Sequence, residues 1–433
     1  MVQAMLASVG EQGYGTTVVA DVIAKAVASR KTFYEHFEDK HACFFALSDE
    51  IAREWVERVE RATGALDGAD ASETADAPDA ERTAQIVDAL VNELFDLALE
   101  SPPALRVLAV ELTAAGPTGI ERRERTLETL ARPLGKALGE EPADGGRLSR
   151  ALVGAILRIL YARARRGAKV RRPRRADLQE IAPEVAAWVN RYKLESDAMP
   201  TQPTTSDAGA TVAVGGRAPG TLSLNSRAIE RRGLPRGEGN VSRSFVVHNQ
   251  RERILDALAN LSAAKGYGAT TIPEIVQEAA VSVQAFYEHF SGKEDAFLVA
   301  YELGHRKALA IVERAYESSE DWPAAVRGGI AVLLEFLASE PAYAHLALID
   351  ALTASPKAAA MAYRAMNGYA AMLEPGLIAD GQPQMAIAVE ATTAALFELC
   401  FVHVASEQAR ELPDLTDIAE YIALQPFVDA SVR

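Results

Sequence analysis

Apolar residues recur at helical spacing along most of this 433-residue chain. In the segment RERILDALANLSAAKGYG, the apolar residues Ile254, Leu255, Leu258 and Leu261 fall on one helical face, and the pattern stops at Gly266. Because comparable patterns run through the chain on both sides of one central stretch, we predict an all-α fold.

Two shorter helices should follow this one. The segment TTIPEIVQEAA offers Thr271 as N-cap, with Glu274 completing a capping box and Pro273 in the first turn. After a break at Ala280, Ser282 should cap a third helix, SVQAFYEHF, of about two turns. Three short helices joined this tightly are typical of a helix-turn-helix, whose last helix enters the DNA major groove.

The same pattern occurs twice. The pentapeptide FYEHF begins at Phe33 and at Phe286, which gives a separation of 253 (286 − 33). That separation also relates Lys40 to Lys293, with no gap over about forty residues, so the chain contains a duplicated domain. Met1 aligns with Ile254, so the first copy lacks a counterpart of RSFVVHNQRER. Either its first helix is truncated or translation begins upstream.

A segment rich in Gly, Pro, Ser and Thr separates the copies, and we predict a linker over 194–243. A flexible chain of that length has an r.m.s. span of roughly 40 Å, so the two copies can fold side by side. Its end is basic and could form an arm in the minor groove. The alternative is a solvated linker that happens to be basic. The arginines concerned are Arg227, Arg231, Arg232, Arg236 and Arg243.

Composition narrows the function further. A net charge of −15 argues against nonspecific polyanion binding, so any nucleic-acid contact must be local. There is no leader pattern and no run of about 18 uncharged apolar residues, so we expect a cytoplasmic protein with no membrane partner. Cys43 and Cys400 are predicted to be reduced core residues. The seven histidines show no metal-ligand spacing, and phosphate-loop and nucleophile motifs are missing, so we expect no enzyme, cofactor or metal.

The segment GYGATTIPEIVQEAAVSVQAFYEHFSGKEDAFLVAY resembles the DNA-binding domain of the TetR (tetracycline-repressor-like) family, and GYGTTVVADVIAKAVASRKTFYEHFEDKHACFFAL is similar to a second, more diverged copy. The resemblance implies two TetR-like units, each with a three-helix head and a helical effector and dimerisation domain, paired as an intramolecular pseudo-dimer. The expected heads are 1–40 and 244–293, and the expected effector domains are 41–193 and 294–433.

The resemblance also implies which residues meet DNA. The third helix should lie in the major groove, while the loop before the second helix and the start of the fourth helix should meet phosphates. In the first copy these residues are Thr17, Ser29, Arg30, Lys31, Thr32, Tyr34, His36 and Lys40. In the second copy they are Thr270, Thr271, Ser282, Val283, Gln284, Tyr287, His289 and Lys293, with Arg236 and Arg243 from the arm.

Some residues of the motif have a structural alternative, and some depart from the family pattern. Solvent exposure without a DNA contact is an equal alternative for His36 and His289, and the four motif phenylalanines, Phe33, Phe37, Phe286 and Phe290, should be core residues. Val27 and Ala280 replace the family's turn glycine, where a left-handed conformation costs roughly 1–2 kcal/mol, so both turns could be distorted. Val18 replaces the capping threonine, which weakens the start of the second helix.

In the family, the last two long helices of each protomer form a four-helix dimer interface. The matching segments are RLSRALVGAILRILYARARRG with LQEIAPEVAAWVNRY, and QMAIAVEATTAALFELCFVHVAS with LTDIAEYIALQPFV. Aligning AILRILY with ALFELCF places Arg158 at the position of Glu398, and basic residues follow the first of these while acidic residues follow the second. Attraction between unlike copies would favour a pseudo-dimer, although solvated charged faces are the alternative. The interface candidates are Arg158, Glu398, Leu157, Tyr161, Phe397 and Phe401.

The family further implies a small apolar effector bound among the helices of each half, and repression as the usual mode. For every ligand candidate, core packing is the alternative. The rival hypothesis is a degenerate regulator whose first head does not bind DNA, acting as a scaffold or a partner-dependent binding protein. The ligand candidates are Phe95, Trp322, Phe336, Tyr343, His345, Tyr363, Phe397, Phe401 and His403.

Overall fold

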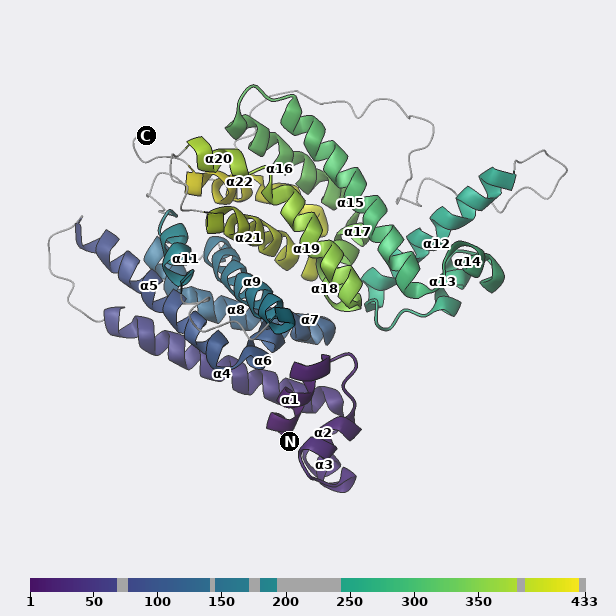
Figure 1. The fold of residues 1–433 in the computed structure, drawn as a ribbon, viewed down its shortest axis with the longest axis horizontal. Coiled ribbons are helices and arrows are strands. Elements are labelled where there is room, and N and C mark those ends of the chain that lie inside the picture. Colours follow the sequence, from purple (N-terminus) through teal and green to yellow (C-terminus); the bar gives the residue numbers. More distant parts are fainter. Residues whose placement is uncertain (68–76, 141–144, 171–179, 193–242, 380–385, 428–433) are drawn as a thin grey trace.

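The computed structural model describes residues 1–67, 77–140, 145–170, 180–192, 243–379 and 386–427. Within these ranges the regular structure is entirely helical, as predicted (Figure 1). The linker arginines Arg227, Arg231, Arg232 and Arg236 lie outside the described residues, and Arg243 begins a helix without a described side chain.

The first unit begins with a head of three short helices, and longer helices follow. Its elements are α1 (Val2–Gln12), α2 (Val19–Lys25), α3 (Arg30–His36), α4 (Lys40–Asp67), α5 (Ala77–Glu100), α6 (Pro102–Arg106), the π-helical η1 (Val107–Glu111), α7 (Leu112–Ala114), α8 (Pro117–Leu138), α9 (Arg147–Val170) and α11 (Ala182–Val189).

The second unit repeats this order. Its elements are α12 (Arg243–Lys265), α13 (Ile272–Glu278), α14 (Val283–His289), α15 (Lys293–Glu317), α16 (Trp322–Ser339), α17 (Pro341–His345), the π-helical η3 (Leu346–Asp350), α18 (Ala351–Ala354), α19 (Pro356–Ala370), α20 (Glu374–Ala379), α21 (Ala386–Ala405), the 3-10 helix η4 (Ala409–Leu415), α22 (Thr416–Leu424) and η5 (Gln425–Phe427).

The second helix of each head begins with a carboxylate that accepts a backbone hydrogen bond. Glu274 accepts from the Thr271 N–H at 2.9 Å, as the predicted capping box requires. In the first head, Asp21 accepts from the Val18 N–H at 2.9 Å. The first copy therefore keeps the carboxylate half of the box, although Val18 has no hydroxyl to contribute.

The turn between the second and third helices has the same left-handed backbone in both heads. Val27 and Ala280 each adopt φ of 49°. The two turns therefore share one geometry despite the missing glycine. The conformational cost remains, and it is larger for Val27, whose branched side chain is 94% exposed and gains nothing from packing.

The third helices are fixed by caps on one side and by phenylalanines on the other. The Ser29 hydroxyl accepts from the Thr32 N–H at 3.0 Å, and Ser282 caps α14 in the same way. Phe33, Phe286 and Phe290 are buried, while Phe37 is half-buried.

Both cysteines are free and buried, and burial raises the pKa of Cys43 to about 11, which keeps the thiol protonated.

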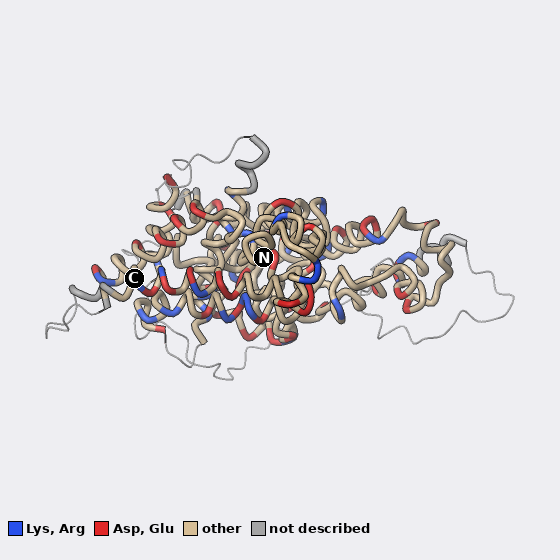
Figure 2. Tube along the Cα trace, turned by 90° about the horizontal axis from the view of Figure 1, so that it is seen from below, with Lys and Arg blue, Asp and Glu red and all other residues tan. Residues whose placement is uncertain are grey.

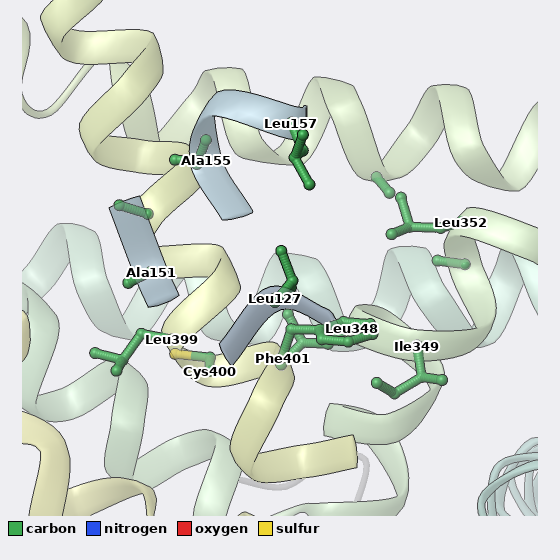
Figure 3. Packing of buried hydrophobic residues seen from close by; sticks show 14 of the residues in the cluster. Leu127, Ala151, Ala155, Leu157, Leu348, Ile349, Leu352, Leu399, Cys400 and Phe401 are labelled. Carbon is green, nitrogen blue, oxygen red and sulfur yellow. The ribbon is translucent and has the colours of Figure 1, made fainter. Parts of the chain in front are cut away.

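The two units pack against each other mainly through α9 and α21 (Figure 1). Figure 3 shows Ala151 of α9 near Leu399 and Cys400 of α21, and the apolar core runs across the contact without a break. The shorter helix α11 joins this contact, because its Trp188 indole donates to Thr392 of α21 at 3.0 Å. The four helices expected from the sequence therefore come together within one chain.

A buried charge cluster lies inside this contact. Glu398 of the second unit is fully buried, and Arg158 of the first unit donates to its carboxylate at 2.9 Å. Arg123 of α8 also pairs with it, at 2.6 Å, and is paired with Glu124 at the same distance. The guanidinium groups lie over aromatic rings, Arg158 at 4.2 Å from the centre of the Phe397 ring. The two arginines hold the pKa of Glu398 below its usual range despite burial.

Two described helical segments are long and apolar enough to cross a membrane, Trp322–Ser339 and Ile387–Ala405. The second is 72% buried within the protein and contains Glu398, which faces the other unit. Core helices of globular proteins satisfy the same criterion, so these segments are weak support for a membrane-spanning role.

Candidate nucleic-acid interface

The outer face of α3 presents polar and basic side chains to solvent. Arg30, Lys31, Tyr34 and His36 are exposed, together with the capping Ser29. Thr32 is half-buried, and its hydroxyl is hydrogen-bonded to that of Ser29 at 2.9 Å. The Lys31 ammonium lies 3.8 Å from the exposed Glu35 carboxylate, so part of its charge is already balanced.

The corresponding face of α14 is less basic. Ser282, Val283, Gln284 and Tyr287 are exposed, and the Gln284 amide donates to Glu288 at 3.2 Å. Tyr287 is 56% exposed, with its ring edge against Phe286, and Tyr34 occupies the same place in the first head. At the positions of Arg30 and Lys31 in α3, α14 therefore has the neutral residues Val283 and Gln284.

The structure contradicts two of the predicted phosphate contacts. Thr17 and Thr270 are buried, and their hydroxyls donate to the carbonyls of Gly13 and Gly266 at 2.7 and 3.0 Å. Their side chains therefore hold the loop in shape and do not face outward. Thr271 is exposed as predicted, with its hydroxyl donating to Glu274 at 2.6 Å.

The lysines at the start of the fourth helices have a structural role in addition to the predicted one. Lys40 donates to the Tyr14 carbonyl at 3.1 Å, and Lys293 donates to the Tyr267 and Thr270 carbonyls at 2.8 and 2.7 Å. Each ammonium also lies over the ring of its tyrosine, and partial burial lowers its pKa. They attach the loop to the long helix, and phosphate contact by their remaining donors stays a prediction.

The predicted histidines differ between the copies. His36 is exposed, whereas His289 is half-buried and its Nε2 is buried without a hydrogen-bond partner. Contact of either ring with phosphate remains a prediction.

Each head is joined to its effector domain by a carboxylate that the sequence did not reveal. The Tyr14 N–H donates to Glu111 at 2.7 Å, and the Tyr267 N–H donates to Asp350 at 3.0 Å. Both carboxylates lie at the end of a π-helical segment, η1 or η3. We call these two hydrogen bonds the head tethers.

The side chain that supports each tether differs. Arg106 pairs with Glu111 at 2.6 Å and also donates to the Gly10 carbonyl at 3.1 Å, whereas His345 is hydrogen-bonded to Asp350 at 3.1 Å. π-Helical segments are often found at functional sites, so the tethers are candidates for transmitting changes to the heads.

The two heads project from the helical body at separate places (Figure 1). Acidic and basic positions are interspersed over the described chain and form no single basic face (Figure 2). Together, two exposed third helices on a duplicated three-helix scaffold define a protein with two helix-turn-helix heads.

Sequence comparisons agree with this geometry. A sequence model described as "Bacterial regulatory proteins, tetR family" matches residues 3–47 and 254–300, which contain the two heads. The chain is also 45% identical over 56 residues to the HTH-type transcriptional regulator YerO of Bacillus subtilis (strain 168). That match covers 13% of this chain and 19% of the relative. Both matches of the family model fall on the heads, so each head is similar to the tetR-family DNA-binding unit, and the chain carries the pattern of that unit twice.

A cavity of about 160 Å³ lies in the second unit, among α15, α16, α17, α19 and α21. Of the predicted ligand residues, Tyr343 and Phe397 line it. Trp322, Phe336, His345, Phe401 and His403 do not line it, and Phe95 is a core residue of the first unit.

Several predicted ligand residues are occupied elsewhere. Tyr363 borders a smaller cavity beside Arg158, Trp322 donates to the Met372 carbonyl at 3.0 Å, and His403 is hydrogen-bonded to the Leu399 carbonyl. Six lining residues that carry polar groups were not among those predicted: Tyr301, His305, Tyr316, Tyr369, Thr393 and Cys400.

The interface candidates all lie at or near the packing of α9 on α21. Arg158 and Glu398 are paired, Phe397 lies beneath Arg158, and Phe401 lies beneath Arg123 at 4.6 Å. Leu157 is buried and Tyr161 is half-buried in the same core.

Proposed function

We propose that the single chain acts as a pseudo-dimer that reads two unlike half-sites on double-stranded DNA. The observation that carries this proposal is the packing of α9 on α21, which joins two heads with different exposed residues on α3 and α14. A homodimer reads a palindrome because operator symmetry mirrors protein symmetry. Two unlike third helices should therefore prefer unequal half-sites.

The buried charge cluster supports pairing within one chain. Arg158 and Glu398 are equivalent positions of the repeat, yet they contact each other. In a two-fold interface, a residue beside the axis meets its own copy. Two first units would bring Arg158 against Arg158, and two second units would bring Glu398 against Glu398. Like charges in a buried contact repel, so unlike pairing is favoured.

Footprinting of the purified protein on its own promoter region tests this proposal. Protection of two adjacent, non-identical half-sites is the expected result. Protection of a palindrome would contradict the reading of unlike half-sites. Light scattering should show a particle of one 46.4 kDa chain, and an obligate dimer of chains would overturn the monomeric pseudo-dimer.

The rival proposal is a first head that does not bind DNA. Against it, the first head keeps the Ser29 cap and the buried Phe33, and it exposes Arg30 and Lys31. We therefore expect the double variant R30A/K31A to abolish protection at one half-site and keep the other. A wild-type footprint covering a single half-site would favour the rival.

We further propose that the protein is a repressor, acting in the cytoplasm, that responds to a small apolar effector. The cavity in the second unit supports this, because Phe397 borders it and also carries the Arg158 guanidinium of the first unit. An effector there would shift the relative position of the heads only through different affinities for the two arrangements. Deletion of the gene should raise transcription from the footprinted promoter, and a fall would indicate activation.

A further inference from the structure

The cavity of the second unit combines a mostly apolar wall with a few uncharged polar groups. Aliphatic side chains form most of its wall, and the lining drawn from the described residues includes no Asp, Glu, Lys or Arg. Its polar side chains are the phenols of Tyr301, Tyr316, Tyr343 and Tyr369, the His305 imidazole, the Thr393 hydroxyl, which donates to the Val389 carbonyl, and the Cys400 thiol. The ring of His305 stacks on Tyr301 and meets the edge of Tyr369, with centroid distances of 6.3 and 5.7 Å.

These polar groups are neutral at physiological pH. Burial lowers the pKa of His305, which favours the uncharged imidazole. Burial and the neighbouring phenols Tyr301 and Tyr369 raise the pKa of Tyr343 well above its usual value. The cavity therefore offers hydrogen bonds without offering a counter-ion, so a charged ligand would lose hydration with no compensation.

The first unit is not built for the same ligand. The register that aligns Lys40 with Lys293 continues along α4 and α15 and places Trp55 at the position of Ala308. Ala308 lines the cavity, whereas Trp55 is a fully buried indole. A tryptophan adds a large volume where the second unit has a methyl group.

The polar groups are replaced as well. In the same register, Ser48 and Ala52 stand in place of Tyr301 and His305. Aligning α6 with α17 at their first prolines puts Ala104 in place of Tyr343. The Ser48 hydroxyl is already used, since it donates to the Phe45 carbonyl at 2.8 Å.

We propose that the chain binds one effector per molecule, in the second unit only, and that this effector is an uncharged compound of one or two rings carrying an oxygen. The inference rests on the ligand response proposed above. The cavity volume supports a one-ring compound most directly, because an apolar cavity of about 150 Å³ accommodates benzene. The oxygen carried by the ring would form hydrogen bonds with the phenol groups of Tyr343 and Tyr369.

Gly304 contributes to the shape of this site. A Cβ at this position would lie 2.1 Å from the Tyr343 ring, far inside contact distance. The glycine therefore allows the phenol to lie directly against α15, between the helix and the cavity.

Calorimetric titration of the DNA-free protein with 1-naphthol tests the inference, with 1-naphthoate as the charged counterpart. We expect saturable binding of one naphthol per chain and at least tenfold weaker binding of naphthoate. Equal binding of the two compounds, two equivalent sites per chain, or no saturable naphthol binding would overturn the proposal. Retention of promoter DNA is measured separately, so a failure of DNA recognition is not confused with a failure of this site.

Variants locate the site. Ala308→Trp installs the first unit's residue and should weaken naphthol binding at least tenfold, while Ala310→Trp, on an exposed position of the same helix, should leave it unchanged. If A308W does not fold, the double variant Y343F/Y369F keeps the cavity shape and should weaken naphthol about fivefold without affecting naphthalene. Unchanged naphthol binding in the folded A308W variant, or in the phenylalanine variant, would contradict the proposed location.

Discussion

Replacing Glu398 by Gln provides the sharpest test of how the two units are held together. The substitution removes the carboxylate that pairs with the Arg158 guanidinium, which is 6% exposed and also lies over the Phe397 ring. Arg123 keeps Glu124 at 2.6 Å, so its charge stays compensated. Breaking a buried ion pair from one side costs about 3–5 kcal/mol. Because the contact between Arg123 and Glu124 survives, we expect E398Q to lower the free energy of unfolding by about 3 kcal/mol.

The assay is urea denaturation followed by circular dichroism, with Glu313→Gln as matched control. Glu313 is exposed on α15, so its substitution should change the free energy of unfolding by less than about 0.5 kcal/mol. The triple variant R123M/E398L/R158M removes the three most buried charges together, while Glu124 keeps Arg150 as a partner at 3.0 Å, and it should be neutral or more stable by about 1–4 kcal/mol. A loss below about 1 kcal/mol for E398Q would refute the view that this carboxylate compensates buried charge.

The pH dependence follows from the same cluster. The arginines depress the pKa of Glu398 in the folded state, so its contribution is fully present above the unfolded value of about 4.3. As pH falls through the lower folded pKa, the native carboxylate becomes protonated and the contribution is lost. The stability difference between wild type and E398Q should therefore shrink below about pH 4.

Three other substitutions and one titration test separate parts of the structure. Val27→Gly should relieve the left-handed turn at φ of 49° and raise the free energy of unfolding by about 0.5–1 kcal/mol, measured in urea. Lys31→Ala should lower the slope of log affinity against log salt by about 1 in filter binding, if the ammonium contacts one phosphate. Asp350→Asn should weaken the second head tether and raise amide hydrogen exchange at Tyr267, without a matching rise at Tyr14. The carboxyl of Glu274 should titrate in NMR with a pKa of about 2, because Lys265 and Thr271 hydrogen-bond to it; a pKa above about 4 would contradict those contacts.

The sequence predicts the three-helix heads because the residues that define them lie within a few positions of one another. The capping residue Ser282, the core position of Phe286 and the third helix between them follow from spacing within a few residues. For Arg158 and Glu398, the repeat alignment predicts equivalent positions among the interface candidates and leaves solvated charged faces as an alternative; their contact is visible only in the packed structure.

Other features depend on contacts between distant segments. Whether Thr17 faces inward is decided by the loop around Gly13, with φ of 85°, and the amino-acid type alone permits either orientation. The tether from Tyr14 to Glu111 joins residues 97 positions apart, which periodicity does not report. The cavity was expected in both halves, and only comparison of Trp55 with Ala308 in a packed structure shows how the two differ.

The contact between Arg158 and Glu398 has an evolutionary consequence. In a homodimer every substitution is expressed in both subunits, so a change that helps one half is imposed on the other. Here the two halves are encoded separately, and each mutation alters a single copy. One half could therefore acquire a tryptophan in its core and an arginine and a lysine on its third helix, while the other kept an open cavity and a third helix without lysine or arginine.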